Sequence, residues 1–222
     1  MRQEVNRQME KTIILNAGHS LTDPGACYNG SQEATEVRKI RDILLPLLEK
    51  QFKVLVVPDE LGLSESIRWT NKQAPTLESG LAFSIHLNAC GDCGATGAET
   101  YFYGSSTKSK DIAQKVIDRY CQVTGFKSRG AKSDTTTRFG SLGWIRNTSC
   151  WSCLIEACFI DNKNDLETLQ QDYNKIAQGI YEGICSVYNI KIEDELVPEP
   201  EITKGSLALA EIINTLKKYK II

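Results

Sequence analysis

The chain has 222 residues, of which 41% are hydrophobic and 24% charged, and its formal net charge at pH 7 is -2. A chain of this length can bury one substantial hydrophobic core and carry a small appended element. The charge balance gives no general electrostatic footprint for nucleic acid or an anionic membrane, and no apolar run approaches the roughly 18 residues of a membrane-spanning helix. We therefore expect a globular protein with neither nucleic acid nor a membrane as its partner.

Short apolar runs alternate with amphipathic segments along most of the chain. β-branched and aromatic residues are typical of strands, whereas apolar residues spaced three or four apart indicate helices. In chain order, the pattern predicts a strand at 12–17, a helix at 33–51, a strand at 52–58, a helix starting near 67–71, strands at 81–89 and 97–104, a helix at 108–125, a strand at 153–160 and a helix at 173–190. This alternation predicts a single α/β domain with a mostly parallel or mixed twisted sheet flanked by helices.

Composition changes at both ends of this pattern. Residues 1–10 form a charged N-terminal extension, and residues 11–190 contain all the predicted strands. Residues 191–204 are acidic and contain prolines, which is typical of a linker. Residues 205–222 predict a short C-terminal helix. We expect this helix to pack on the domain, to self-associate or to act as a small targeting element, so the protein is expected to be a monomer or a weak oligomer.

The chain contains two histidines, and each lies at the end of a predicted strand. His19 follows the first strand, in "LNAGHSLTDPGA", and His86 lies near the carboxyl end of the third, in "SIHLN". In open α/β sheets, ligands bind beyond the carboxyl ends of strands, so we expect the two imidazoles to converge. The alternative for either histidine alone is a structural hydrogen-bonding role.

A carboxylate is the expected third member of such a site. Catalytic zinc commonly has three protein ligands, for example two histidines and a carboxylate, and an open position for water. Glu33 and Glu36 both follow His19 at a suitable distance, and residues three apart share a helix face, so the residues alone do not choose between them. Either glutamate is also explained as a first-turn acid that complements the helix dipole.

Glu156 is a carboxylate inside an otherwise apolar predicted strand, "CLIEACF". Burial of a carboxylate is costly unless the group is paired, bound to metal or functional. Burial and neighbouring charge also tune its basicity, which suits a group that takes a proton from water and passes it on. The alternative is a buried ion pair with an arginine such as Arg146.

The eight cysteines are expected to be mostly thiols, because the chain is neither small nor visibly secreted. Two CxxC pairs stand out, "CGDC" at 90–93 and "CWSC" at 150–153. Their spacing predicts either a structural zinc or a redox dithiol, but neither pair lies at a strand-to-helix turn, where a redox dithiol is normally found. The structural zinc would be held by all four of these cysteines, Cys90, Cys93, Cys150 and Cys153.

Six stretches, in order, carry a family resemblance: "GHSLTDPGA", "GSQE", "FSIHLNA", "GAETYFY", "SRGAK" and "LIEACFIDNKNDLETL". From about Lys11 to Tyr188 the chain resembles the zinc-dependent N-acetylmuramoyl-L-alanine amidases of the amidase-3 family, which includes cell-wall hydrolases and phage endolysins. The resemblance implies His19, Glu33 and His86 as ligands of a catalytic Zn²⁺ and Glu156 as the catalytic residue. It selects Glu33 over Glu36 through the family's glycine-x-x-glutamate spacing. It also makes Asn88 a candidate site-lining residue.

The resemblance implies peptidoglycan as the partner and hydrolysis of the amide between N-acetylmuramic acid and L-alanine as the reaction. Because the first residues contain no apolar segment of the signal-peptide type, we expect a phage-type endolysin that stays in the cytoplasm until it is released to the cell wall. The alternatives are a host autolysin or sporulation-related amidase, a noncatalytic wall-binding module, and a thiol-zinc structural module. "GHSL" and "VPDELG" depart from the family's glycine-histidine-glycine-glycine and threonine-arginine patterns, so we expect a modified substrate groove.

Overall fold

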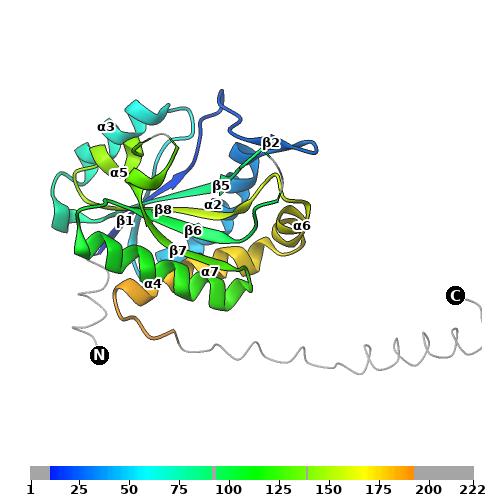
Figure 1. The fold of residues 1–222 in the computed structure, drawn as a ribbon. Coiled ribbons are helices and arrows are strands. Elements are labelled where there is room, and N and C mark those ends of the chain that lie inside the picture. The colour runs from blue at the N-terminus through cyan, green and yellow to red at the C-terminus, as the bar shows by residue number, and fades with distance from the viewer. Residues whose placement is uncertain (1–10, 92–93, 139, 193–222) are drawn as a thin grey trace, which may run out of the picture. The chain divides into compact units, whose positions relative to one another are not determined.

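The computed structural model describes residues 11–91, 94–138 and 140–192. These residues form a mixed six-stranded sheet with the strand order β4-β1-β5-β8-β6-β7 and a separate two-stranded hairpin, β2-β3 (Figure 1). The strands are β1 (Thr12–Ala17), β2 (Cys27–Tyr28), β3 (Ser31–Gln32), β4 (Lys53–Val56), β5 (Leu81–Asn88), β6 (Ala98–Phe102), β7 (Ser128–Ser133) and β8 (Trp151–Phe159). The α-helices are α2 (Glu33–Glu49), α3 (Leu63–Gln73), α4 (Thr107–Thr124), α5 (Gly143–Asn147), α6 (Lys163–Gln171) and α7 (Tyr173–Val187).

Strand direction divides the sheet into two parts. The strands β4, β1, β5 and β8 run parallel to one another. β6 runs antiparallel to β8, and the edge strand β7 runs parallel to β6. The carboxyl ends of β1, β5 and β8 therefore meet at one edge of the sheet, where ligands of open α/β sheets bind.

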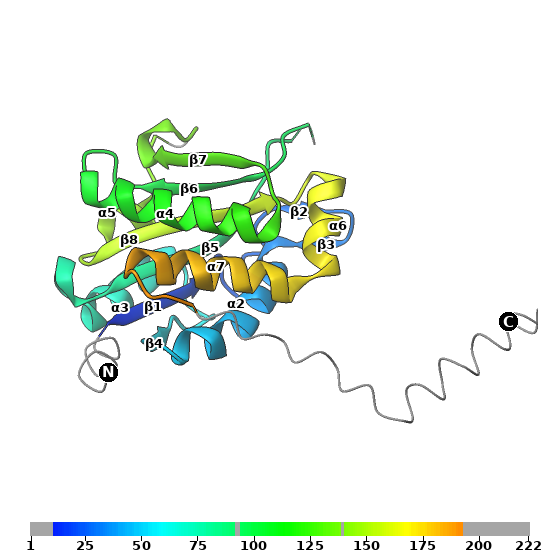
Figure 2. The same ribbon diagram turned by 90° about the horizontal axis from the view of Figure 1, so that it is seen from below.

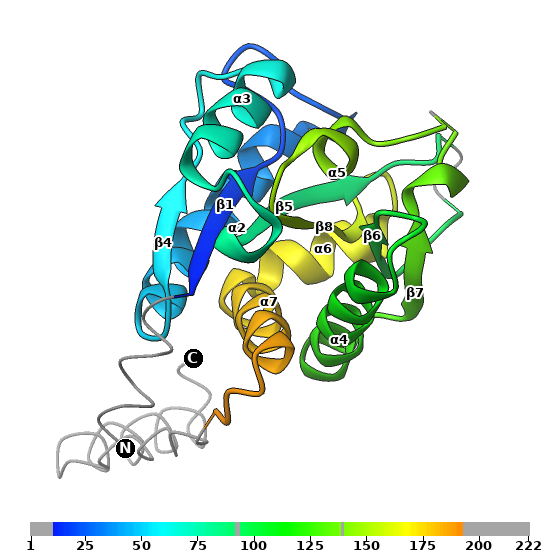
Figure 3. The ribbon, with the colours of Figure 1, turned by 90° about the vertical axis from the view of Figure 1, so that its left-hand side faces the viewer.

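Helices cover the two faces of the sheet unequally. α4 and α7 lie side by side on one face, and α2 packs against α7 and against strands β1 and β5 (Figure 2). α3 and α5 lie on the opposite face (Figure 3). There they bury an apolar cluster that includes Ile14, Ile67, Tyr101, Trp144 and Leu154.

The face beneath α3 and α5 changes from apolar to polar along the strands. Residues two apart on a strand share a face, so buried Ala82 precedes His86 on the same face of β5, and Leu154 precedes Glu156 on β8. His86, Asn88 and Glu156 are half-buried, whereas most of β5 and β8 is buried. The carboxyl half of this face therefore presents polar side chains that the α3-α5 cluster does not cover.

The predicted α/β fold with a mixed sheet flanked by helices is confirmed. The predicted strand at 12–17 has the bounds of β1, and the other strands and helices predicted within residues 11–190 each have a counterpart. The predictions missed the β2-β3 hairpin, β7, α5 and α6. β7 has the sequence "SRGAKS", which lacks β-branched and aromatic residues, so its strand conformation depends on pairing with β6.

The terminal predictions fall mostly outside the described residues. The structure describes neither the extension at 1–10 nor residues 193–222, which contain most of the predicted linker and the whole predicted C-terminal helix. Within the described ranges, no helix has both the length and the hydropathy needed to cross a membrane.

Candidate metal centre

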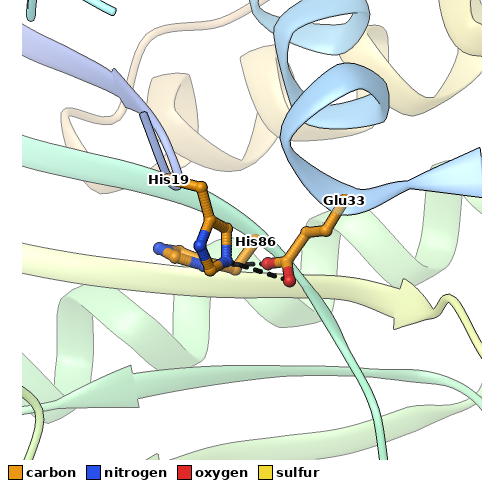
Figure 4. Close-up of side chains that lie close together, drawn as sticks. All are labelled: His19, Glu33 and His86. Carbon is orange, nitrogen blue, oxygen red and sulfur yellow. Dashed lines mark hydrogen bonds and ion pairs between the residues drawn. The ribbon is translucent and has the colours of Figure 1, made fainter. Parts of the chain in front are cut away.

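His19, Glu33 and His86 lie together at the carboxyl edge of the sheet (Figure 4). Each offers one ligand atom, and these three atoms lie within 4.8 Å of one another. His19 Nε2 is 2.9 Å from Glu33 Oε2, and His86 Nδ1 is 3.0 Å from Glu33 Oε1. His19 follows β1 and His86 lies in the neighbouring parallel strand β5, while Glu33 is the first residue of α2. The structure thus brings together the three residues that the sequence analysis selected.

The Glu33 carboxylate is fixed from two sides. The backbone N–H of Ala26 donates to Oε2 and that of Leu87 donates to Oε1, each at 3.0 Å. Burial opposes the charged form of Glu33, but hydrogen bonds from His19 and His86 outweigh it and hold the pKa of this carboxyl well below its usual range. Glu33 therefore presents a charged carboxylate to both imidazoles.

Glu36 has a different role in the structure. It is also buried, but its carboxylate accepts hydrogen bonds from Lys39 Nζ and the Tyr173 hydroxyl, so it ties α2 to the start of α7. The geometry thus separates the two glutamates that helix spacing left equivalent, and only Glu33 faces the histidines.

His19 is held in an uncommon backbone conformation. Its φ is 69°, in the left-handed region that residues other than glycine adopt rarely and that is often found at functional sites. Its Nδ1 lies 2.8 Å from Asp23 Oδ2, which orients the ring so that Nε2 faces Glu33. Burial lowers the pKa of His19, but Glu33 and Asp23 more than offset this and raise that pKa to about 9.

Two glycines, which have no side chain, leave room for the side chains of the site. A Cβ on Gly18 would lie 2.4 Å from His86 Cε1. A Cβ on Gly25 would lie 2.6 Å from His19 Nε2 and 2.8 Å from Glu33 Oε2, and Gly25 also has a positive φ of 66°. The glycines of "AGHS" and "DPGA" thus permit close packing around the site, in addition to forming its turns.

Glu156 lies beside this cluster on the next strand. It is the lateral partner of His86 across the β5-β8 ladder, and Glu99 of β6 lies on its other side. Its Oε2 is buried and has no hydrogen-bond partner among the described residues. Burial, followed by the charges of Glu33 and Glu99, raises the pKa of Glu156 well above its usual range. An unpartnered carboxyl with a raised pKa is suited to proton transfer.

The alternative pairing of Glu156 with Arg146 is wrong. Arg146 instead binds Asp134, with Nη2 3.1 Å from Oδ1, and its guanidinium lies over the ring of Tyr103. Glu156 is thus not neutralised by that arginine.

Glu99 is a buried acid that the sequence analysis did not single out. Its Oε1 accepts hydrogen bonds from Asn88 Nδ2 at 2.9 Å and the Tyr101 hydroxyl at 2.6 Å. Its Oε2 accepts from Arg129 Nε at 2.6 Å and Lys132 Nζ at 2.5 Å. The sequence carries the same signal for Glu99 as for Glu156, namely a single acid within an apolar strand. Asn88, the candidate site-lining residue, thus lies beside the site and binds Glu99.

The prediction of one zinc shared by both CxxC pairs is wrong. Cys90 follows the carboxyl end of β5, whereas Cys150 precedes β8 and Cys153 is buried near its amino end. β5 and β8 are parallel, and Leu81 of β5 lies beside Trp151 of β8. Cys90 therefore lies at the opposite end of the sheet from Cys150 and Cys153, at least about 20 Å away. Cys93 lies outside the described residues.

Comparisons with known proteins show the family of the chain. Residues 13–186 match the model of a family described as Amidase_3, N-acetylmuramoyl-L-alanine amidase. The endolysin of Bacillus phage SPP1 is 33% identical over 193 residues, which cover 82% of this chain and 68% of that protein. The N-acetylmuramoyl-L-alanine amidase LytC of Bacillus subtilis is 27% identical over 187 residues, covering 82% of this chain but only 36% of that protein.

A solved structure shows the same fold. The N-acetylmuramoyl-L-alanine amidase from Clostridium difficile 630 superimposes with a TM-score of 0.73 at 24% identity, covering 83% of this chain and all of that one. The chain therefore has the fold of a solved amidase structure, although it spans only part of the length of its longer relatives.

Proposed function

The chain belongs to the N-acetylmuramoyl-L-alanine amidase family, and we propose that it uses a zinc ion to hydrolyse the amide between N-acetylmuramic acid and L-alanine in peptidoglycan. One arrangement carries the proposal: His19, Glu33 and His86 lie within reach of one ion, with Glu156 on the adjacent strand. The family match supports the substrate, and the donor set supports the metal.

The donor atoms fit zinc. Two imidazole nitrogens and one carboxylate oxygen form a common catalytic zinc set, which leaves a position for water or substrate. The contact between His19 and Asp23 is the kind of outer hydrogen bond that orients a histidine ligand. When bound, zinc polarises a carbonyl oxygen and lowers the pKa of its bound water to about 7. The chain would hold such an ion through His19 Nε2, His86 Nδ1 and Glu33.

Glu156 supplies the proton transfers in this proposal. Its buried, unpartnered Oε2 is free to accept a proton from the attacking water. The same carboxyl then donates this proton to the leaving amine of L-alanine, so that one residue serves both steps. Its position in a central strand, rather than in a loop, keeps it in register with His86.

Digestion of purified peptidoglycan tests the proposed reaction. We expect the zinc-loaded protein to release stem peptides that begin with a free L-alanine amine, identified by mass spectrometry, and to stop releasing them when a chelator removes the metal. Sugar fragments with new reducing ends would instead indicate a glycosidase, and shortened stem peptides an endopeptidase. Either product pattern would contradict the proposal.

The biological setting we favour is that of a phage-type endolysin released to the cell wall. Its support is the similarity to the SPP1 endolysin, which has the highest sequence identity among the relatives described above. A host autolysin or sporulation-related amidase has the same chemistry and is the second candidate, since LytC of Bacillus subtilis is also similar. Expression in the host cytoplasm, with and without a membrane-permeabilising protein, separates the two candidates. An endolysin lyses the cells only when the membrane-permeabilising protein is also present.

A further inference from the structure

Arg129 and Lys132 form a pair of cations on the edge strand β7, in the stretch "SRGAK" that the proposed catalytic mechanism does not use. Both contact the same carboxylate oxygen, Oε2 of Glu99. The guanidinium of Arg129 also lies over the ring of Phe159, at 4.9 Å from its centroid. These contacts hold both side chains on the sheet instead of leaving them free in solvent.

The cation pair lies on the same side of the sheet as the candidate metal centre. His86, Glu156 and Glu99 are lateral neighbours on β5, β8 and β6, and β7 is the next strand. Adjacent strands are about 4.8 Å apart, so β7 runs roughly 14 Å from the strand of His86. The long side chains of Arg129 and Lys132 extend back from β7 toward Glu99 and so shorten this distance.

The positive charge of the two cations exceeds the negative charge of Glu99. Glu99 is only 2% exposed and carries one negative charge, whereas two cations contact it. Arg129 and Lys132 are 32% and 31% exposed, so both are accessible to a ligand. Arg129 binds Glu99 through Nε, and its two Nη groups have no hydrogen-bond partner among the residues that the structure describes. The cluster thus offers a net positive charge and unused donors.

We propose that Arg129 and Lys132 bind a carboxylate of the substrate's stem peptide. This inference rests on the proposed amidase function. Of the two substrate parts that flank the cleaved amide, only the peptide carries carboxylates, because the carboxyl of N-acetylmuramic acid is itself in the amide. An extended peptide spans about 3.3–3.6 Å per residue, so the second residue of the stem brings its free carboxylate within reach of the two side chains. Guanidinium donors match a carboxylate well in geometry and charge.

The test compares two ligands that differ by one group, N-acetylmuramoyl-L-alanyl-D-isoglutamyl-L-lysine and the corresponding isoglutaminyl compound. Their binding is measured by calorimetry on the full-length, zinc-loaded Glu156→Gln variant, which leaves the ligand intact. We expect the acid to bind about tenfold more tightly than the amide, as a charge-assisted contact at a half-exposed site would give. Adding Arg129→Gln or Lys132→Gln to this variant should remove the preference, because only the binding of the acid compound should weaken.

Two further variants control for structural effects. Arg129→Lys keeps the charge and should retain most of the preference, whereas Lys110→Gln removes an equivalent cation from α4, on the opposite face, and should change nothing. The subsite would be overturned if the Glu156→Gln protein bound the acid and amide compounds with equal affinity. It would also be overturned if Arg129→Gln weakened the binding of both compounds equally. A third outcome separates the subsite from the proposed function. If the Glu156→Gln variant binds the acid compound more tightly than the amide but the wild type does not cleave the acid compound, the subsite stands and the proposed function fails.

Discussion

His86 in β5 and Glu156 in β8 are lateral neighbours in the central sheet. The candidate metal ligand and the candidate proton carrier are therefore fixed to each other by a backbone ladder, and not by two independent loops. His19 and Glu33 reach the site from a turn and from the start of a helix, and the Gly18 and Gly25 positions keep space open around them.

The two glutamates of α2 should differ in their effect on zinc. Glu33→Gln removes the charged ligand atom, so we expect zinc affinity to fall by more than about 100-fold. Glu36→Gln preserves a hydrogen-bonding side chain in a cluster that does not face the histidines, and it should retain zinc. Metal analysis after dialysis measures both, and a Glu33→Gln protein that keeps its zinc would exclude Glu33 as a ligand.

Asp23 should act on the metal through His19. Asp23→Asn weakens the hydrogen bond that orients the imidazole, so zinc affinity is expected to fall by about 10- to 100-fold with little change in the fold. Competition with a fluorescent chelator gives the affinity. Asp42, an exposed acid on α2 that binds Arg41, offers a matched control: Asp42→Asn should leave zinc binding unchanged. Equal affinities in the wild type and Asp23→Asn would show that His19 needs no such support.

Gly25 should be required for space as well as for its backbone conformation. Gly25→Ala and Gly30→Ala both place a side chain at a positive φ, which costs about 1 kcal/mol of stability. Only at Gly25 would the new Cβ collide with His19 and Glu33, because no heavy atom lies within 4 Å of the Cβ position at Gly30. We expect similar losses from backbone strain, measured by urea unfolding, but loss of zinc only in Gly25→Ala. Zinc retention by Gly25→Ala would contradict the steric argument.

The metal-free protein should lose stability as the pH rises. The pKa of His19 is raised from 6.5 to about 9 by Glu33 and Asp23 despite burial. The protonated imidazole therefore stabilises the fold fully below about pH 6.5, and this contribution disappears as the pH rises through about 9. Thermal unfolding in chelator at a series of pH values checks this, with His19→Gln as the variant that lacks the transition. A wild-type transition equal to that of His19→Gln would contradict the assignment.

Local patterns predicted much of the site. His19 and His86 were identified because both lie at strand ends, and Glu156 because it interrupts an apolar strand. The choice of Glu33 over Glu36 depends on the direction from which α2 approaches the strands. Helix spacing alone does not give this direction, so the choice came from the family resemblance. The role of Glu99 depends on β7, whose pairing with β6 joins segments about 30 residues apart and has little local propensity. The prediction of a shared cysteine site was wrong for a similar reason, since only the parallel register of β5 and β8 places Cys90 at the opposite end of the sheet from Cys150 and Cys153.

The most direct test of the central claim is the Glu156→Gln variant, measured for both zinc content and release of stem peptides from purified peptidoglycan. Because Glu156 lies beside the candidate ligands and is not one of them, we expect zinc to be retained at the wild-type level. Release should fall by about 100- to 10,000-fold, the range expected for loss of a general acid-base. Glu78→Gln, at an exposed position before β5, is the control and should match the wild type in both measurements. Undiminished release by a zinc-loaded Glu156→Gln protein would contradict the mechanism.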